Sequence, residues 1–257
     1  MRVADRDLVA HRLRQTRGAA FPPGEFVGQE SFVSASEVLL LGRQAGIAPG
    51  VSVLDLCCGE SGPGLHLTRE LGCTYLGVDA SPDSVARARR RSADEGLQAC
   101  FDVGEVPPLP AGPFDVVLLL ETMLAFPDKR PLLEEVSSAL RPGGRFGFTL
   151  EAGAALTSAE AELMPGADTV WLTPLPRLRS DLNRAGLRVR WCVETSRAHR
   201  ATVDALADAY AAAAPELREA GGGPAVDGLI ASHRLWSRWL REGRVRKFDV
   251  VAEKVGP

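Results

Sequence analysis

The feature that most constrains this 257-residue chain is a short run between an apolar segment and a helical pattern. Residues 54–64 read Leu-Asp-Leu-Cys-Cys-Gly-Glu-Ser-Gly-Pro-Gly. Glycines in such a loop let the backbone approach a ligand closely, and the N-terminus of the following helix favours negative or electron-rich groups. The GxxxxGK[ST] pattern of a P-loop is absent, and Gly59-x-x-Gly62-x-Gly64 is only a loose dinucleotide-binding pattern. The run therefore predicts a ligand-binding turn between a strand and a helix.

The two adjacent cysteines of this loop, Cys57 and Cys58, are interpreted as small packing residues. A zinc site needs three or four ligands at suitable spacing, and neither CxxC nor HxxxH occurs with them. A redox dithiol would also need two intervening residues. The five cysteines are an odd number and lie mostly in apolar runs, as expected of reduced, buried thiols. We therefore expect no metal site.

Strand-like and helix-like segments alternate through the first 150 residues. Apolar, β-branched runs occupy 51–56, 74–78, 98–102, 114–120 and 145–150, and helical patterns occupy 65–71, 84–95 and 131–140. This alternation favours parallel βαβ units. Ser81 is the expected N-cap of the second of these helices. The Arg-Pro-Gly-Gly run at 141–144 is expected to end the third helix and form a turn.

The C-terminal part of the chain predicts a helix at 176–185, strands at 187–194 and 247–255, and a long helical excursion between those strands. Because a strand pair needs no connection of about fifty residues, we interpret the excursion as an added lid. The expected organisation is 1–46 as N-terminal helices (5–17 and 35–45) covering the site, 47–196 as the core, 197–242 as the helical lid, and 243–257 as the final strand.

Composition excludes some classes of protein. The net charge of −3 gives no global attraction to nucleic acid. The N-terminus lacks the apolar core of a signal peptide, and the longest aliphatic run, Val116–Leu120, is far short of the ~20 residues of a membrane span. We expect a cytoplasmic protein without nucleic-acid or membrane partners, and a homodimer remains open.

Three acids occupy the ends of the first three predicted strands. Asp55 precedes the glycine loop, Asp79 ends the second strand twenty residues beyond Gly59, and Asp102 ends the third. The carboxyl ends of parallel strands form the ligand-binding edge of a sheet, where an acid can accept hydrogen bonds from ribose hydroxyls. Each acid alone could be a capping or solubilising residue. All three together favour a nucleoside site.

With these residues the chain resembles the class I S-adenosylmethionine-dependent methyltransferases over residues 29–195 and the last strand. VLDLCCGESGPG is similar to the first motif of that family, GVDAS to the second and FDVGEVPPLP to the third. FDVVLLLETMLAF corresponds to the fourth, and LRPGGRFGFTLE to the turn into the fifth strand. The resemblance implies an α/β, Rossmann-like, doubly wound, seven-stranded sheet, mostly parallel, with an antiparallel last strand.

The chain departs from the family pattern at two places. Cys57 and Ser61 stand where the first motif usually has its first and third glycines. Many small-molecule members also have a histidine just after the fourth strand, where this chain has Glu121-Thr122. The second departure removes the commonest catalytic base.

The resemblance also implies a set of contacts to S-adenosylmethionine. The core residues of this set are Asp55, Cys57, Gly59, Asp79, Ala80, Asp102, Val103 and Glu121. The segment GQESFVSASEVL resembles the cover of the cofactor in small-molecule members, which adds Gln29, Phe32 and Ser34. The alternative for these three residues is an ordinary entry to the helix at 35–45.

Methyl transfer from a sulfonium is an in-line displacement in which the enzyme aligns the reactants and excludes water. A hydroxyl or protonated amine acceptor also needs a base. Glu121 is the first candidate, with a contact to the cofactor's amino-acid part or a structural role as the alternatives. His199 and His233 in the lid could reach a substrate, and Tyr210 could orient a substrate hydroxyl.

The sequence therefore predicts a methyltransferase that acts on a small molecule, with a bacterial secondary metabolite as the expected acceptor class and the methylated atom left open. One alternative is a protein that keeps the S-adenosylmethionine pocket without methylating. Another is a nicotinamide-dependent oxidoreductase, which would share the ribose-binding acid but would not explain the fourth and fifth motifs. Fold alone does not decide between them.

Overall fold

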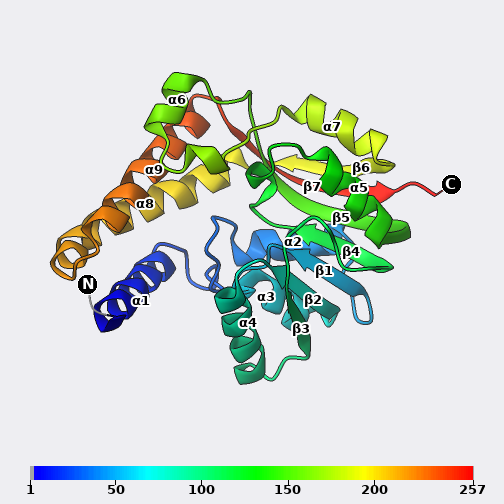
Figure 1. Ribbon diagram of the computed structural model, residues 1–257, viewed down its shortest axis with the longest axis horizontal. Helices are drawn as coiled ribbons and strands as arrows, with labels where there is room; N and C mark the ends of the chain where they lie inside the picture. Colours follow the sequence, from blue (N-terminus) through cyan, green and yellow to red (C-terminus); the bar gives the residue numbers. More distant parts are fainter. Residues whose placement is uncertain (1–2, 257) are drawn as a thin grey trace.

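The computed structural model describes residues 3–256 and contains one seven-stranded sheet (Figure 1). The strands are β1 (Ser52–Leu56), β2 (Thr74–Asp79), β3 (Ala99–Val103), β4 (Phe114–Leu119), β5 (Leu140–Ala152), β6 (Leu187–Glu194) and β7 (Arg246–Lys254). Their order in the sheet is β3-β2-β1-β4-β5-β7-β6. β7 runs antiparallel to both β5 and β6, and the neighbouring pairs among β1 to β5 are parallel. The predicted fold class is confirmed.

Helices cover both faces of this sheet. The main helices are α1 (Val3–Ala19), α2 (Ala35–Gln44), α3 (Gly62–Leu71), α4 (Pro82–Asp94), α5 (Arg130–Ala139), α6 (Ser158–Leu163), α7 (Leu175–Arg184), α8 (Ser196–Glu219) and α9 (Gly223–Arg241), with 3-10 turns η1 (Met123–Ala125) and η2 (Ala167–Thr169). On one face α5 and α7 bury leucines such as Leu133 and Leu182. On the other, α2, α3 and α4 bury Leu41, Leu65 and Val85. Burial on both faces explains why the strands read as continuous apolar runs.

Local signals set the ends of several elements. Ser81 caps α4, because its hydroxyl accepts a hydrogen bond from the amide of Ser84 at 3.2 Å. The expectation of a separate turn at 141–144 is wrong: α5 ends at Ala139, and β5 already pairs with β4 at Leu140. The register shifts between Phe114 and Val116, and Gly143 has a φ of 73°, so the extra residues form a bulge within the strand.

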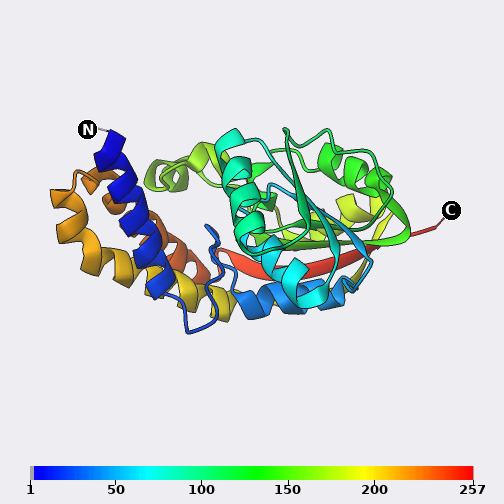
Figure 2. The same cartoon turned by 90° about the horizontal axis from the view of Figure 1, so that it is seen from below.

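The helices between β6 and β7, α8 and α9, extend beyond the sheet as an antiparallel pair (Figure 1). We call them the insertion helices. α1 packs across α8 (Figure 2), and the buried side chains there include Leu206, Tyr210 and Val226. The insertion helices thus have a hydrophobic core of their own next to the N-terminal helix.

The loop of residues 20–34, called the lead-in loop, connects α1 to α2 at the edge where β1, β4 and β5 end. Arg17, which is 5% exposed, ties it down: its Nε donates to the carbonyl of Gln29 at 3.0 Å and its Nη2 to that of Ser31 at 2.8 Å. The lead-in loop therefore closes over the ligand-binding edge of the sheet. Among the helices of residues 3–256, none combines the length and the hydropathy that crossing a bilayer requires.

Candidate active site

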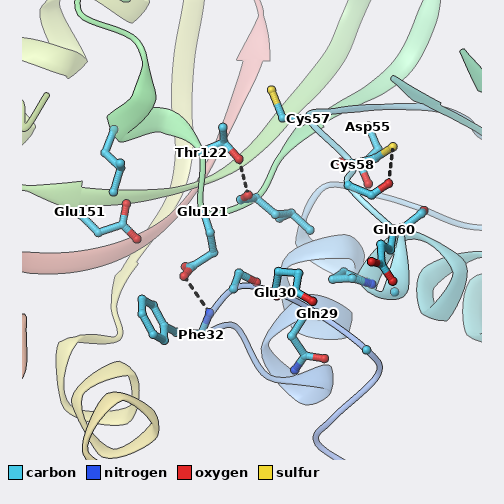
Figure 3. Close-up of a pocket in the computed structure, with 18 of the residues that line it drawn as sticks. Gln29, Glu30, Phe32, Asp55, Cys57, Cys58, Glu60, Glu121, Thr122 and Glu151 are labelled. Atoms are coloured by element: carbon cyan, nitrogen blue, oxygen red, sulfur yellow. Dashed lines mark hydrogen bonds between the residues drawn. The ribbon is translucent and has the colours of Figure 1, made fainter. Parts of the chain in front are cut away.

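A cavity of about 340 Å³ lies at the carboxyl ends of β1 and β4, between the glycine loop and the lead-in loop (Figure 3). Of the residues predicted to bind a cofactor, six line it: Gln29, Phe32, Asp55, Cys57, Gly59 and Glu121. Glu151 and Trp236 line it as well. The cavity thus brings together residues from the N-terminal segment, the central strands and α9.

The charged side chains that line this cavity are all acidic, and basic groups behind the wall, Lys247 and Arg87, contact three of them. Its lining includes five carboxyl side chains, those of Glu30, Asp55, Glu60, Glu121 and Glu151, and within the described chain no arginine, lysine or histidine lines it. Such a wall attracts cations and opposes the phosphates of a dinucleotide. A sulfonium and an ammonium group, the two cationic groups of S-adenosylmethionine, fit this set of donors and acceptors.

The glycine loop has an unusual backbone. Cys57, Gly59 and Ser61 all have a φ of 55°, in the left-handed region that favours glycine. Cys57 and Ser61 therefore hold the backbone geometry of the glycines that they replace in the family pattern. A Cβ built on Gly59 would meet no atom within 4 Å, so the backbone at Gly59 faces open space that a ligand can occupy.

Two other glycines are required by close packing. A Cβ on Gly62 would collide with the carbonyl oxygen of Val27 in the lead-in loop, and one on Gly64 with the hydroxyl of Tyr75. That hydroxyl donates to Asp55 Oδ2 at 2.6 Å and lies 2.7 Å from Ser61 Oγ. Tyr75 therefore fixes the loop to the end of β1, and sequence reasoning overlooked it.

Burial governs the ionisation of the groups beneath the loop. It raises the pKa of Asp55 to about 7, against the opposing hydrogen bond from Tyr75. Burial, together with the charges of Asp79 and Asp55, raises the pKa of the Cys57 thiol to about 12. Because a thiol must ionise to bind metal or attack, this raised pKa favours the predicted packing role of Cys57 over metal binding or nucleophilic attack.

The remaining predicted cofactor contacts lie next to the cavity along the same sheet edge. Asp79 accepts hydrogen bonds from the amides of Gly59 at 2.8 Å and Ser81 at 2.9 Å. It stands opposite Val103 in the register of β2 and β3. Ala80, Asp102 and Val103 are exposed there. The strand-end acids thus form a continuous edge leading away from the cavity.

The lead-in loop uses its polar side chains internally. The Gln29 amide donates to the carbonyls of Glu25 at 3.0 Å and Val33 at 2.8 Å, and its oxygen accepts from the amide of Val27 at 2.7 Å. Ser34 caps α2 by accepting from the amide of Glu37 at 3.3 Å. Gln29 therefore lines the cavity while its polar atoms hold the lead-in loop together. Ser34 does not line the cavity, and its hydroxyl caps α2 instead.

Glu121 belongs to a buried charged cluster that the sequence did not reveal. Its carboxylate pairs with the ammonium of Lys247 and accepts a hydrogen bond from the amide of Phe32 at 3.2 Å. Lys247 Nζ also donates to Glu151 Oε1 at 2.8 Å. We call Glu121, Glu151 and Lys247 the Glu–Lys cluster. Figure 3 shows Glu121 reaching toward the backbone of Phe32, with Glu151 beside it.

His199 of α8 completes this cluster from the side of the insertion helices. It is 1% exposed, and burial lowers its pKa to about 3, so the imidazole is neutral. One ligand atom each from Glu121, Glu151 and His199 lie within 4.8 Å of one another. These are residue types that bind metals, but the ammonium of Lys247 already contacts both carboxylates.

His233 and Tyr210 lie farther from the cluster, at a second cavity of about 420 Å³. Its walls come from α1, the lead-in loop and the insertion helices, and they include Leu13, Phe32 and Leu229. Burial lowers the pKa of His233 to about 4. The two cavities share Glu30 and Phe32. The three catalytic candidates predicted in the insertion helices therefore lie at two places. His199 lies at the Glu–Lys cluster, and Tyr210 and His233 lie at the second cavity.

The comparison with protein families matches residues 47–186 to a methyltransferase domain family. A methyltransferase named GfsG from Streptomyces halstedii is 28% identical over 74% of this chain and 69% of its own length. The 27-O-demethylrifamycin SV methyltransferase of Amycolatopsis mediterranei is 28% identical over 70% of this chain and 71% of its own.

Solved structures show the same fold. The mycolic acid cyclopropane synthase CmaA1, in complex with S-adenosylhomocysteine, superposes with a TM-score of 0.80 over 99% of both chains at 12% identity. The family match covers more than half of the sequence. The chain belongs to the class I S-adenosylmethionine-dependent methyltransferases and methylates a small-molecule acceptor.

Proposed function

We propose that the cavity over the glycine loop holds the sulfonium and amino-acid parts of S-adenosylmethionine, and that the edge formed by Asp79, Asp102 and Val103 holds its nucleoside. The observation that supports this placement is that the charged side chains lining the cavity are all acidic, with Lys247 and Arg87 balancing three of the five from behind the wall. When bound, the cofactor supplies an electrophilic methyl group on a positively charged sulfur.

Individual residues have distinct roles in this proposal. Asp79 accepts the ribose hydroxyls in addition to the two loop amides, because each carboxylate oxygen can accept more than one hydrogen bond. Ala80 and Val103 lie against the adenine, and either the Asp102 carboxylate accepts from its amino group or the amide of Val103 donates to a ring nitrogen. Gly59 provides space, and the carboxylates of Asp55 and Glu121 lie nearest the ammonium and the sulfonium.

We further propose that the acceptor enters through the second cavity and is a hydroxyl-bearing metabolite with both apolar and polar parts. The cavity combines the apolar side chains of Leu13, Phe32 and Leu229 with polar and charged ones, which are those of Arg14, Arg17, Glu30, Tyr210 and His233. It meets the cofactor cavity at Phe32, so a ligand there would place a hydroxyl next to the methyl group. The resemblance to an enzyme that methylates demethylrifamycin SV supports a secondary metabolite as acceptor.

The insertion helices serve in this proposal as the lid over the acceptor, and residues 1–46 as the cover of the cofactor. We place the enzyme in the cytoplasm, where the cofactor is made, and assign it no nucleic-acid partner, since the net charge of −3 gives no attraction to phosphates.

Calorimetric titration with S-adenosylmethionine, S-adenosylhomocysteine and NADH tests the cofactor site. We expect binding of the two sulfur compounds and none of NADH. Asp79→Ala removes two charge-assisted hydrogen bonds, each contributing about 1.5–3 kcal/mol, so the affinity should fall about 100-fold or more. The exposed acid Asp94, at the far end of α4, gives the matched control Asp94→Ala. Binding of NADH alone would contradict the proposal.

The acceptor proposal is tested by a screen of hydroxylated macrolactones and ansamycins, including demethylrifamycin SV, with S-adenosylhomocysteine measured as product. Leu229→Trp, which fills the second cavity, should raise the KM of any acceptor found and leave cofactor binding unchanged. Leu40→Trp, at an exposed position of α2, is the control. Cofactor binding without product from any acceptor would instead favour a protein that does not methylate.

A further inference from the structure

We propose that Glu151 is the base that takes the proton from the acceptor hydroxyl, and that Lys247 positions its carboxylate. This inference rests on the proposed hydroxyl acceptor. It assigns the base to the end of β5, whereas the sequence pointed to Glu121 at the end of β4.

The geometry of β5 and β7 places the two residues together. Glu151 stands directly opposite Lys247 in the antiparallel register, and their side chains are 2% and 0% exposed. Lys247 Nζ holds Glu151 Oε1 at 2.8 Å. Glu151 lines the cofactor cavity, and its other oxygen, Oε2, is buried and has no partner within the described chain. A buried carboxylate oxygen without a donor is costly, and an acceptor hydroxyl would supply the missing hydrogen bond.

Glu121 is less suited to this role because Lys247 and the lead-in loop already contact its two carboxylate oxygens, although Oε1 makes no hydrogen bond within the described chain. One carboxylate oxygen pairs with Lys247 and the other accepts from the amide of Phe32. Its own amide donates to Thr149 Oγ1 at 2.6 Å, and its φ is 58°. These contacts hold Glu121 as the link between the lead-in loop and Lys247.

The tautomer of His199 excludes it as the base. The indole nitrogen of Trp236 lies 3.4 Å from His199 Nε2, and an indole N–H can only donate. His199 Nε2 is therefore the acceptor, and the proton of the neutral ring is on Nδ1. That Nδ1 has no partner within the described residues. It can donate to a carboxylate or to the acceptor oxygen, but it cannot receive a proton there.

The charged surroundings allow Glu151 to exchange a proton near neutrality. Burial raises its pKa to about 7 and lowers that of Lys247 to about 8. The other titratable groups facing the cluster are Glu121, His199, Glu37 of α2 and Asp249 of β7, and burial raises the pKa of Asp249 to about 8. A base whose pKa lies near the working pH is the most effective.

The proposed step balances without a further reactant. The acceptor oxygen forms a bond to the methyl carbon, and the carbon–sulfur bond breaks with its electron pair left on sulfur. The hydroxyl proton passes to Glu151 Oε2. The products are the methyl ether, S-adenosylhomocysteine and a protonated Glu151, which then returns its proton to water.

The first test needs no acceptor. Protein labelled with 13C at the glutamate side-chain carboxyls is titrated by NMR, so that aspartates such as Asp55 and Asp249 give no signal. We expect one glutamate resonance to titrate near pH 7 and to be absent in Glu151→Gln. If every glutamate carboxyl titrates below pH 5, the proposal is overturned.

The second test is turnover with an acceptor that the wild-type enzyme methylates. General-base catalysis contributes about 100- to 10,000-fold, so Glu151→Gln should lower kcat by that factor with cofactor affinity unchanged. The rising limb of the wild-type pH profile near pH 7 should disappear. Glu162→Gln, at an exposed glutamate of α6, is the matched control.

Lys247→Met separates positioning from proton transfer. Loss of its positive charge disfavours the ionised carboxylate, so the rising limb should move to higher pH while remaining visible. If this variant does not fold, the NMR titration of the labelled carboxyls and the turnover of Glu151→Gln still test whether Glu151 is the base.

Three results would contradict the inference. Glu151→Gln with full turnover would show that another base acts. Turnover that EDTA abolishes and Mg²⁺ or Zn²⁺ restores would mean that Glu121, Glu151 and His199 hold a metal ion. If the rising limb of the pH profile is at the same pH in Lys247→Met as in the wild type, Lys247 does not position Glu151. Failure of the proposed function is distinct, because wild-type protein would then bind no S-adenosylmethionine.

Discussion

The glycine loop and the Glu–Lys cluster form two walls of one cavity, but they are built in different ways. The loop is contiguous: residues 54–64 carry its turn, its strained backbone and its close contacts. The cluster is assembled from Glu121, Glu151 and Lys247, which are up to 126 positions apart in the sequence and meet only because β7 inserts beside β5. The loop is held by backbone geometry and by close packing at Gly62 and Gly64, whereas the cluster is held by buried charges.

This difference determines what maintains each wall. The loop depends on backbone conformation and on the absence of side chains at Gly62 and Gly64. The cluster depends on charge balance in a buried site, where removing one partner of an ion pair is more costly than the pair is stabilising. The two walls should therefore differ in how far a single substitution destabilises them and in how that loss depends on pH.

The largest effect is expected for Lys247→Met. It leaves two buried carboxylates without their cation, which costs about 3–5 kcal/mol. The pKa of Glu151, already raised by burial to about 7, should rise further. Protonation then removes the unpaired charge, so the loss in the free energy of unfolding should be smaller at pH 5.5 than at pH 8. Urea unfolding at both pH values measures this.

Lys254→Met is the control for that measurement. Lys254 lies at the other end of the same strand, and within residues 3–256 its ammonium donates to the carbonyl of Leu140 alone. Its replacement should cost about 1 kcal/mol, equally at both pH values. A Lys247→Met loss that is small, or equal at both pH values, would mean that the cluster is not held by charge balance.

The second effect concerns the contiguous wall. Gly62→Ala places a methyl group against the carbonyl of Val27, where the lead-in loop crosses the start of α3. Overpacking of this kind costs about 1–3 kcal/mol, and because the obstacle is backbone, the lead-in loop must move. We expect a lower thermal midpoint and weaker binding of S-adenosylmethionine. Gly228→Ala in α9, where a Cβ meets nothing within 4 Å, should leave binding unchanged and raise the thermal midpoint slightly, because alanine favours a helix interior over glycine by about 1 kcal/mol.

The same contrast explains which parts could be predicted from the sequence. The parallel strands and the loop were predictable because strand, turn and helix follow one another within short windows of sequence. The run at 141–144 was misread because Pro-Gly-Gly usually marks a turn, and the bulge depends on pairing with β4. The position of Asp79 and Asp102 at one edge of the sheet was predictable because the carboxyl ends of parallel strands lie at the same edge.

The Glu–Lys cluster could not be predicted in this way. Lys247 begins an apolar strand, which is an ordinary place for a charged residue, and nothing nearby indicates its register against β5. One signal was present in Glu151: a carboxyl group that ends the long apolar run Phe146–Leu150 at the ligand-binding edge. Tyr75 was overlooked for a similar reason, since its partners Asp55 and Ser61 lie on another element.

Tyr75→Phe removes the hydroxyl that joins the glycine loop to Asp55. The free energy of unfolding should fall by about 1–2 kcal/mol, the penalty for buried polar groups left without a partner. The hydrogen bond from Tyr75 lowers the pKa of Asp55, against burial, so its loss should raise that pKa above 7. Since a protonated Asp55 needs no donor, the destabilisation should be larger at pH 8 than at pH 5.5. Tyr210→Phe, which loses only a 3.3 Å contact to Arg17, should show no such dependence.

The smallest effect is expected for Cys57→Gly. A residue other than glycine at a φ of 55° carries a strain of about 1–3 kcal/mol, and glycine would relieve it. The variant loses the packing of the thiol and gains freedom in the unfolded chain, which costs about 0.4–1 kcal/mol. These contributions oppose each other, so the free energy of unfolding should change by less than about 1 kcal/mol.

Ser61→Gly shares the same φ but loses the hydroxyl contact to Tyr75, and it should be the less stable of the two by about 1 kcal/mol. The order of the two variants in urea unfolding therefore separates backbone strain from side-chain bonding: if Cys57→Gly were the less stable, the thiol would contribute more to the loop than its left-handed backbone costs.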